Sequence, residues 1–201
     1  KVLIVIPSFK HGGTNKSLEN LLTTLKGSND DYFVFSLNQY GPYSSLKEVT
    51  NILPSNPLLD LLTTPLELNR GLKVLFAFVI KVIFKFCKIF GIDLYRALFK
   101  KAARKIMNRD FEVVISFQEG FTTDFVSHFN AKIKVAWIRS DYSEYCKLNN
   151  NTCELSIYEK FNKIICVSEY TKDVFLKIYP SLLSKTIAVH NVINSDKILE
   201  R

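Results

Sequence analysis

The chain has 201 residues, of which 47% are hydrophobic, 23% are charged and 13% are aromatic. This length and composition suffice for a substantial hydrophobic core and exclude a disordered chain. The formal net charge is +8, and it is concentrated in residues 70–109, where eleven Lys or Arg and a single acidic residue, Asp93, give +10. A basic segment of this kind fits an anionic partner of any class, including nucleic acid.

Along the chain, the predicted elements alternate between strands and helices. Apolar runs predict strands at 1–9, 32–37, 111–117, 134–138, 163–167 and 186–189. Apolar residues at helical spacing predict helices at 15–25, 66–108, 122–129 and 169–178. Continuously apolar strands separated by helices are typical of a parallel sheet covered on both faces. The predicted fold class is therefore α/β: a Rossmann-like, doubly wound, mostly parallel sheet with helices on both faces.

The cysteines and histidines show no metal-binding spacing. The four cysteines contain no CxxC pair, and the three histidines are far from them in sequence; these residues are Cys87, Cys146, Cys153, Cys166, His11, His128 and His190. We therefore expect no metal site, and reduced thiols rather than a disulfide framework. The first residues read as a strand and lack the pattern of a signal peptide, which leads us to expect a cytoplasmic protein.

Ligands of open parallel sheets bind beyond the carboxyl ends of the strands, which directs attention to the loops there. The first loop contains Gly12, Gly13 and Thr14. Two glycines allow a phosphate to approach the backbone closely, and the N-terminus of the following helix offers free N–H groups. The alternative is that the glycines only form a tight turn between strand and helix.

Two later loops carry charged residues. Glu119 could accept hydrogen bonds from sugar hydroxyls, or it could cap the helix that begins near Thr122. Arg139 offers a planar cation suited to phosphate oxygens, or it could form a surface ion pair with Asp141 or Glu144.

The last of these loops contains Ser168 and Glu169, which precede the predicted helix at 169–178. Ser168 is a typical N-cap residue of such a helix. No Ser–His–Asp or Cys–His arrangement is recognisable in the sequence, so we assign no nucleophile.

Taken in order, these loops resemble the N-terminal domain of GT-B glycosyltransferases, in particular family 4 of the retaining enzymes. The glycine-containing segment of that family is similar to residues 12–22, and its late strand–turn–helix segment is similar to residues 164–171. Its ending resembles residues 189–194, although His190 replaces the usual proline. Family members commonly have a histidine where Arg139 stands. Arg139 keeps a positive charge at this position but is a poor proton donor. The difference is therefore more compatible with stabilisation of a phosphate than with acid catalysis.

The resemblance implies that residues 1–201 form one Rossmann-like acceptor-side domain and that the donor-binding domain lies outside the chain. It implies a metal-independent, retaining glycosyltransferase of the hexosyltransferase type, without a tightly bound cofactor. Such an enzyme would transfer a sugar from a UDP- or GDP-sugar to a saccharide or lipid-linked acceptor, in the synthesis of cell-surface polysaccharide (capsule or lipopolysaccharide) or glycolipid. The isolated chain would be inactive. The alternative is a non-catalytic α/β module that binds a nucleotide or a sugar.

The resemblance also suggests roles for individual residues. Gly12, Gly13 and Thr14 would approach the donor phosphates. Arg139 and Asp141 are the candidates for catalysis. Glu119, Ser168 and Glu169 are the candidates for binding the acceptor or a sugar.

The basic, phenylalanine-rich segment 72–92 is not explained by the resemblance. At about 100° per residue, its lysines fall within an arc of roughly 120°, and nearly all of the remaining circumference is apolar; they are Lys73, Lys81, Lys85 and Lys88. The segment could be a buried helix, a helix lying in the interface of an anionic membrane, or a membrane span, which the central lysines disfavour. The interfacial arrangement would place the protein at the inner face of the cytoplasmic membrane. The phenylalanines stand among aliphatic residues and not in a basic groove, which disfavours binding to nucleic acid.

Overall fold

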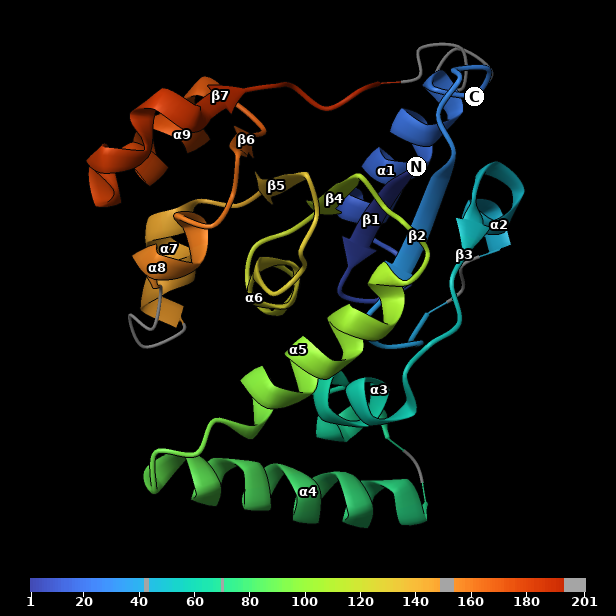
Figure 1. The fold of residues 1–201 in the computed structure, drawn as a ribbon, viewed down its shortest axis with the longest axis vertical. Helices are drawn as coiled ribbons and strands as arrows, with labels where there is room; N and C mark the ends of the chain where they lie inside the picture. Colours follow the sequence, from blue (N-terminus) through green and yellow to red (C-terminus); the bar gives the residue numbers. More distant parts are fainter. Residues whose placement is uncertain (42–43, 70, 149–153, 194–201) are drawn as a thin grey trace.

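The computed structural model describes residues 1–41, 44–69, 71–148 and 154–193. Within these residues, parallel strands form one seven-stranded sheet in the order β3–β2–β1–β4–β5–β6–β7 (Figure 1). The strands are β1 (Val2–Ile6), β2 (Tyr32–Ser36), β3 (Asn51–Ile52), β4 (Val113–Ser116), β5 (Ile133–Ile138), β6 (Lys163–Cys166) and β7 (Thr186–Ala188). The predicted α/β fold with a parallel sheet is confirmed, and every pairing in the sheet is parallel.

Helices connect the strands and cover both faces of the sheet. The α-helices are α1 (Gly13–Thr24), α2 (Ser44–Val49), α3 (Pro57–Thr63), α4 (Leu72–Ile89), α5 (Leu94–Met107), α6 (Phe121–Ser127), α7 (Tyr142–Leu148), α8 (Leu155–Tyr158) and α9 (Glu169–Ile178). Two 3₁₀ turns, η1 (Leu66–Leu68) and η2 (Pro180–Lys185), complete the described elements.

The central strand β1 is buried on both sides, which explains its uninterrupted apolar sequence. On one face of the sheet, Ile4 packs in a cluster with Leu18 and Leu22 of α1. On the other face, Leu3 belongs to a larger cluster that includes Phe99 of α5 and residues of α3, α6, α7, α8 and α9. Side chains alternate in direction along a strand, so adjacent residues of β1 enter different halves of the core.

The predicted helical region 66–108 is divided into the 3₁₀ turn η1 and the two helices α4 and α5. The structure separates α4 from α5 at residues 90–93, where the side chain of Asp93 caps α5 by accepting a hydrogen bond from the backbone N–H of Arg96 (3.0 Å). An aspartate at this position satisfies an N–H group that has no partner within the helix, so a new helix begins there.

Several short elements were not predicted. The region between β2 and α4 contains α2, β3 and α3, where prolines had suggested only turns. Pro57 is compatible with α3 because it occupies the first turn, and Asn56 caps that helix by accepting from Leu58 and Leu59. Helices α7 and α8 are also short, and such lengths carry too little periodicity to be recognised from a sequence.

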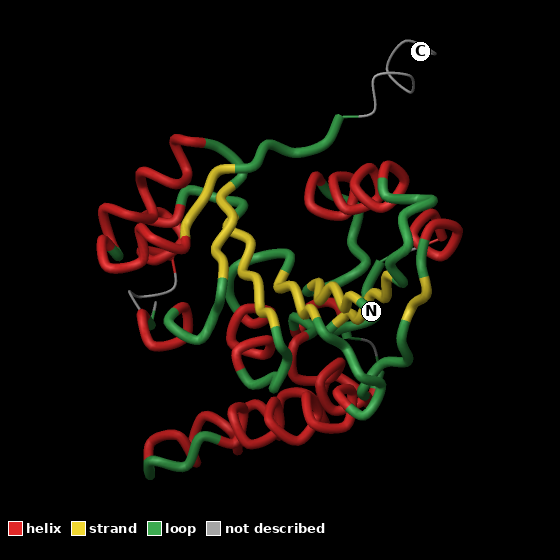
Figure 2. The backbone as a smooth tube through the Cα atoms, turned by 45° about the horizontal axis from the view of Figure 1, so that its top comes forward, coloured by secondary structure: helices red, strands yellow, loops and turns green. Residues whose placement is uncertain are grey.

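Helix α4 lies along the edge of the molecule, away from the sheet (Figures 1 and 2). Ala77 is its only buried residue, so the interpretation of this segment as a core helix is wrong within the described part of the chain. None of the helices that the structure describes is long and apolar enough to span a membrane, which removes the spanning alternative for α4.

The expectation of reduced thiols is correct for two cysteines and wrong for a third. Cys87 and Cys166 are free, whereas Cys146, on α7, is disulfide-bonded. Cys153 lies outside the described residues. A disulfide depends on the distance between two Cα atoms in the fold, and the spacing of cysteines in the sequence does not reveal that distance.

Candidate functional site

The strand order reverses between β1 and β4, and parallel sheets commonly bind ligands at the carboxyl edge of such a point. The chain runs outward from β1 through β2 to β3, then returns to place β4 on the other side of β1. Helix α1, after β1, and helix α6, after β4, pack on opposite faces. Connections that leave in opposite directions leave space for a ligand between them. We call this region, with Gly12, Gly13, Glu119, Arg139 and Asn191, the switch-point site.

The glycine loop presents open backbone at this site. Gly12 and Gly13 are both exposed, and a Cβ atom built on either meets no atom within 4 Å. Helix α1 begins at Gly13, and no side chain caps its N-terminus. The side chain of Asn15 holds the loop by donating to the carbonyl oxygens of Ser8 (2.9 Å) and Lys10 (2.7 Å). The N–H groups of the first turn are therefore accessible to an anion.

A close backbone contact at a second position, Gly41, also holds this loop in place. Gly41, after β2, has φ +113°, and a Cβ atom on it would lie 2.2 Å from the backbone carbonyl of Phe9. No side chain fits at that distance, and the positive φ itself favours glycine. The loops that follow β1 and β2 are thus packed backbone to backbone.

Glu119 links the loops that follow β4 and β5. Its side chain is buried; Oε2 accepts from the backbone N–H of Arg139 (2.9 Å) and Oε1 accepts from the hydroxyl of Ser140. The N-cap of α6 is Gly120, and no side chain caps that helix, so the capping alternative for Glu119 is wrong. Because both oxygens bind residues of the β5 loop, Glu119 acts as a positioning group for Arg139.

Arg139 lies beside the first turns of α1. Its Nη2 donates to Oδ1 of Asn191 (2.9 Å), and the same oxygen accepts from the hydroxyl of Ser17 on α1 (2.9 Å). The guanidinium carbon is 4.6 Å from the centroid of the Phe117 ring. Partial burial lowers the pKa of Arg139, and the charge of Glu119 opposes that shift; a guanidinium remains a cation in either case.

The contacts of Arg139 leave one donor unused. Its Nη1 is shielded from solvent and has no hydrogen-bond partner among the described residues. The alternative of a surface ion pair with Asp141 or Glu144 is wrong, because Asp141 binds other groups and Glu144 pairs with Lys147 (2.6 Å). A shielded, unpaired N–H of a cation is suited to an oxygen of an anionic ligand.

Asp141 is placed as a helix cap. Its Oδ1 accepts from the backbone N–H groups of Ser143 (2.9 Å) and Glu144 (3.2 Å) at the start of α7, and its Oδ2 accepts from the hydroxyl of Tyr170 (2.8 Å). The hydrogen bonds from Tyr170 and Ser143 lower the pKa of Asp141 to about 2. A carboxylate with that pKa stays ionised at neutral pH, which makes it a poor general acid.

The loop after β6 is used mainly to start α9. Ser168 accepts from the backbone N–H of Thr171 (3.1 Å), so its predicted N-cap role is confirmed. Glu169 is exposed and forms an ion pair with Lys172 (2.8 Å). Asn191, which bridges α1 and Arg139, was not predicted as a site residue. The available signal was its place in the segment 189–194 that resembles the ending of the family; Asn194 lies outside the described residues.

The lysines of α4 do not surround its exposed apolar side. Lys81, Lys85 and Lys88 line a pocket between α4 and the rest of the molecule. The Nζ of Lys81 donates to the carbonyl oxygen of Thr64, and burial lowers the pKa of Lys81. Lys73 lies in the first turn of the helix and is exposed.

Solved structures of known proteins share this fold. A structure of Anabaena Alr3699/HepE in complex with UDP and glucose superimposes with a TM-score of 0.58 and 15% identity, covering 95% of this chain and 44% of that one. The apo form of the lipopolysaccharide outer core galactosyltransferase WaaB gives a TM-score of 0.55 and 12% identity, covering 96% of this chain and 46% of that one. No family model and no curated protein matches the sequence.

The chain therefore shares a Rossmann-like α/β fold with a protein that was solved with UDP and glucose and with a galactosyltransferase. At identities of 15% and 12%, the similarity establishes the fold and leaves the activity to be argued from the residues. The chain spans less than half the length of either neighbour.

Proposed function

We propose that this chain is the acceptor-side domain of a glycosyltransferase that uses a UDP- or GDP-sugar. The observation that carries the proposal is the combination, at one switch point, of an open glycine backbone at the N-terminus of α1 and the unpaired Nη1 donor of Arg139. Asn191 bridges the two, since it contacts both Arg139 and Ser17 of α1. A helix N-terminus and a guanidinium together form an anion site that suits a diphosphate.

Charge stabilisation is the chemistry that these residues can supply. As the bond between sugar and nucleotide breaks, negative charge grows on the leaving diphosphate, and fixed N–H donors lower the barrier most when they face that charge. Glu119 holds the β5 loop so that the position of Arg139 does not depend on the ligand. We assign no nucleophile. The proposal includes a retaining and metal-independent transfer of a hexose.

A membrane-associated acceptor completes the proposal. Helix α4 exposes apolar side chains that occupy an arc of about 160° at 100° per residue; those that are more than half exposed are Leu72 (76%), Leu75 (60%), Phe76 (63%), Phe78 (53%), Phe86 (60%) and Ile89 (73%). The surrounding segment 70–109 has a net charge of +10. An exposed apolar face on a basic segment fits the interface of an anionic membrane. The enzyme would thus work at the inner face of the cytoplasmic membrane on a saccharide or lipid-linked acceptor for cell-surface polysaccharide or glycolipid.

Substitution of the glycines tests the donor site. In the intact protein, Gly12→Ala and Gly13→Ala should leave the melting temperature unchanged, because the added Cβ meets no atom and Gly12 has extended backbone (φ 169°). The same methyl group would stand where a phosphate oxygen approaches. Loss of one hydrogen bond to a charged group is worth roughly tenfold in affinity, so calorimetry with UDP-glucose and GDP-mannose should show donor binding at least that much weaker.

Two further variants sharpen the test. Asp30→Ala, exposed in the loop that precedes β2 at the opposite edge of the sheet, serves as a control with unchanged binding. Arg139→Gln should lower kcat more than it raises KM, since the cation acts on charge that develops in the transition state. If the intact protein neither binds nor turns over any nucleotide sugar, the proposed function is wrong. Binding without transfer would favour the non-catalytic module.

A further inference from the structure

A pocket of about 550 Å³ lies between α4 and the body of the molecule. Its walls come from α4, α5, α6, α7 and α8, and its lining residues extend from Lys81 to Tyr158. This volume falls within the range of about 300–1,000 Å³ that is typical of small-molecule sites. None of the roles described for the switch-point site uses it.

The α4 side of the pocket is cationic. Lys81, Lys85 and Lys88 follow one another at i, i+4 and i+7, a spacing that places them on one side of a helix, roughly opposite the exposed apolar arc. Lys81 is engaged by the carbonyl oxygen of Thr64. The side chains of Lys85 and Lys88 form no ion pair or hydrogen bond with any residue that the structure describes. Two ammonium groups are therefore available to an anion in the pocket.

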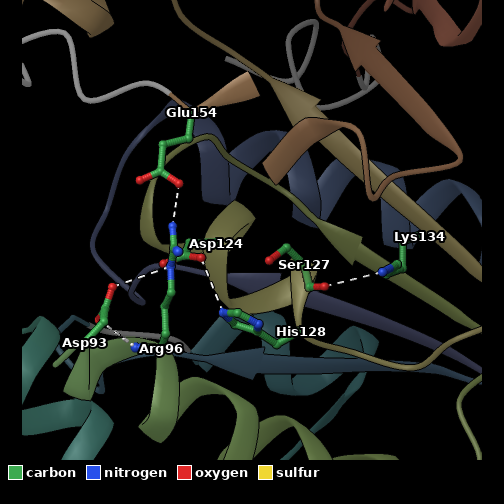
Figure 3. A network of polar contacts seen from close by, with 7 residues as sticks. All are labelled: Asp93, Arg96, Asp124, Ser127, His128, Lys134 and Glu154. Carbon is green, nitrogen blue, oxygen red and sulfur yellow. Dashed lines mark hydrogen bonds and ion pairs between the residues drawn. The ribbon is translucent and has the colours of Figure 1, made fainter. Parts of the chain in front are cut away.

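The arginine of the pocket is not available in the same way. Arg96 lies between two carboxylates: its Nε is 3.4 Å from Oδ2 of Asp93, and its Nη2 donates to Glu154 (Figure 3). These contacts compensate its charge. The carboxylate on the α6 wall of the pocket is Asp124, whose Oδ1 is 3.4 Å from Nε2 of His128.

The opposite wall suits a sugar. It is built mainly from aromatic rings, among them Tyr95, Phe121, Tyr142 and Tyr145, and Phe84 of α4 meets Tyr95 edge to face (4.9 Å between centroids). Aromatic rings can pack against the C–H face of a saccharide, while a carboxylate such as Asp124 accepts hydrogen bonds from hydroxyl groups. The pocket thus combines a surface suited to binding a saccharide with the two unpaired ammonium groups of Lys85 and Lys88.

The pocket adjoins both α4 and the loop of the switch-point site. Gly120 lines the pocket, and the preceding residue, Glu119, holds Arg139. On the other side, α4 presents its apolar face outward. A headgroup bound in this pocket would therefore lie beside the loop that carries Glu119.

We propose that the pocket binds a phosphate-bearing saccharide, the headgroup of a lipid-linked acceptor, with its phosphate on Lys85 and Lys88 and its sugar against the aromatic wall. The proposal rests on the proposed function in that the bound saccharide is the acceptor. Binding itself requires no donor, so the two can fail separately.

Calorimetric titration of the intact protein with glucose 1-phosphate, glucose and inorganic phosphate tests the pocket. Glucose 1-phosphate should bind at least tenfold more tightly than either of the other two, because only it engages both walls. The double variant Lys85→Glu and Lys88→Glu should weaken glucose 1-phosphate at least tenfold, as expected when contacts to a charged group are lost and repulsion replaces them. The control variant Lys73→Glu and Lys100→Glu, exposed positions of α4 and α5 outside the pocket, changes the net charge equally and should bind normally.

Two additional measurements separate the sugar, the phosphate and the lipid. Asp124→Asn should weaken glucose 1-phosphate and leave inorganic phosphate unaffected. Vesicles with phosphatidic acid should compete with glucose 1-phosphate if lipid phosphates enter the pocket, which would assign the cations to membrane lipid and overturn the acceptor proposal. Equal binding of glucose 1-phosphate to wild type and to the Lys85, Lys88 double variant would overturn it too. Unaltered UDP-glucose binding in the double variant would show that the proposed donor site stands independently.

Discussion

The carboxylate of Asp141 joins two helices that are 20 residues apart in the sequence. It caps α7 through the N–H groups of Ser143 and Glu144, and it accepts from the hydroxyl of Tyr170 in α9. These donors favour the ionised form, which is why the pKa of Asp141 falls to about 2. Asp141 lies near Arg139 in the sequence because the β5 loop ends where α7 begins. Its contacts are those of a helix cap.

Removal of one donor should move the pKa of Asp141. Tyr170→Phe deletes the hydrogen bond to Oδ2 and should raise that pKa toward its ordinary value of 3.8, as measured by NMR titration of the side-chain carboxyl carbon. A depressed folded-state pKa stabilises the fold above pH 4, and the contribution disappears as the pH falls from about 4 to 2. Wild type should therefore lose stability relative to Tyr170→Phe over that interval.

The pH experiment has a matched control. Tyr40→Phe removes an exposed tyrosine hydroxyl elsewhere on the surface and should not alter the titration of Asp141. Ser143→Ala, which deletes another of its hydrogen bonds, should raise the pKa in the same direction as Tyr170→Phe. An Asp141 pKa unchanged by both variants would contradict the capping role.

Helices α4 and α5 are consecutive and both basic, yet they belong to different environments. In α5, Phe99, Ala102 and Ala103 recur at helical spacing and are buried against the sheet. In α4, by contrast, Ala77 alone is buried. An apolar side chain in the middle of α4 therefore contributes little to folding, which leaves its hydrophobic surface for a partner.

Serine substitution on α4 tests membrane docking. Leu75→Ser together with Phe86→Ser should reduce co-sedimentation with vesicles of phosphatidylglycerol and phosphatidylcholine at least tenfold, because each side chain contributes roughly 1.5–3 kcal/mol when it leaves water. The melting temperature should not change, since both side chains are 60% exposed in the folded protein.

Exposed leucines elsewhere provide the comparison. Leu148→Ser with Leu183→Ser removes side chains that are 83% and 64% exposed, on α7 and η2, and should leave vesicle binding intact. Pure phosphatidylcholine should bind more weakly than the anionic mixture. If wild-type protein does not co-sediment with either kind of vesicle, α4 is not a membrane contact.

At the scale of the whole molecule, the sheet supplies only one side of the proposed donor site. The glycine loop, Glu119 and Arg139 lie at its carboxyl edge, and the chain covers 44% and 46% of two solved protein chains that share its fold. A donor held only by a helix N-terminus and one guanidinium would remain largely in water, where electrostatic stabilisation is weak. The proposed chemistry therefore calls for a second domain that encloses the nucleotide.

Residues 1–201 produced alone should fold cooperatively and fail to transfer sugar. The expected fold follows from the core on both faces of β1, and the expected inactivity follows from the missing enclosure of the donor. Circular dichroism melting and a nucleotide-release assay with UDP-glucose would check both. Transfer by residues 1–201 at a rate within tenfold of the intact protein would show that no further domain is needed.

How much of this could be predicted from the sequence depends on the range of the interactions. Uninterrupted apolar runs such as β1 predicted buried parallel strands, because a strand covered on both faces has no polar side to alternate with. The capping role of Ser168 was predictable because a cap acts on residues only three positions away. The loops that form the switch-point site were also identified, because parallel strands bring all their carboxyl ends to one edge.

Contacts between distant segments had to come from the folded chain. Glu119 binds the backbone of Arg139, and Asn191 contacts Ser17, which is 174 positions away in the sequence. Periodicity and capping patterns cover only a few residues, so they cannot predict contacts over such separations. The exposure of α4 was undecidable from its periodicity, because an apolar arc looks the same whether a neighbouring element covers it or not. Local order follows from short-range chemistry in the chain, whereas the partner of each side chain follows from how the elements pack.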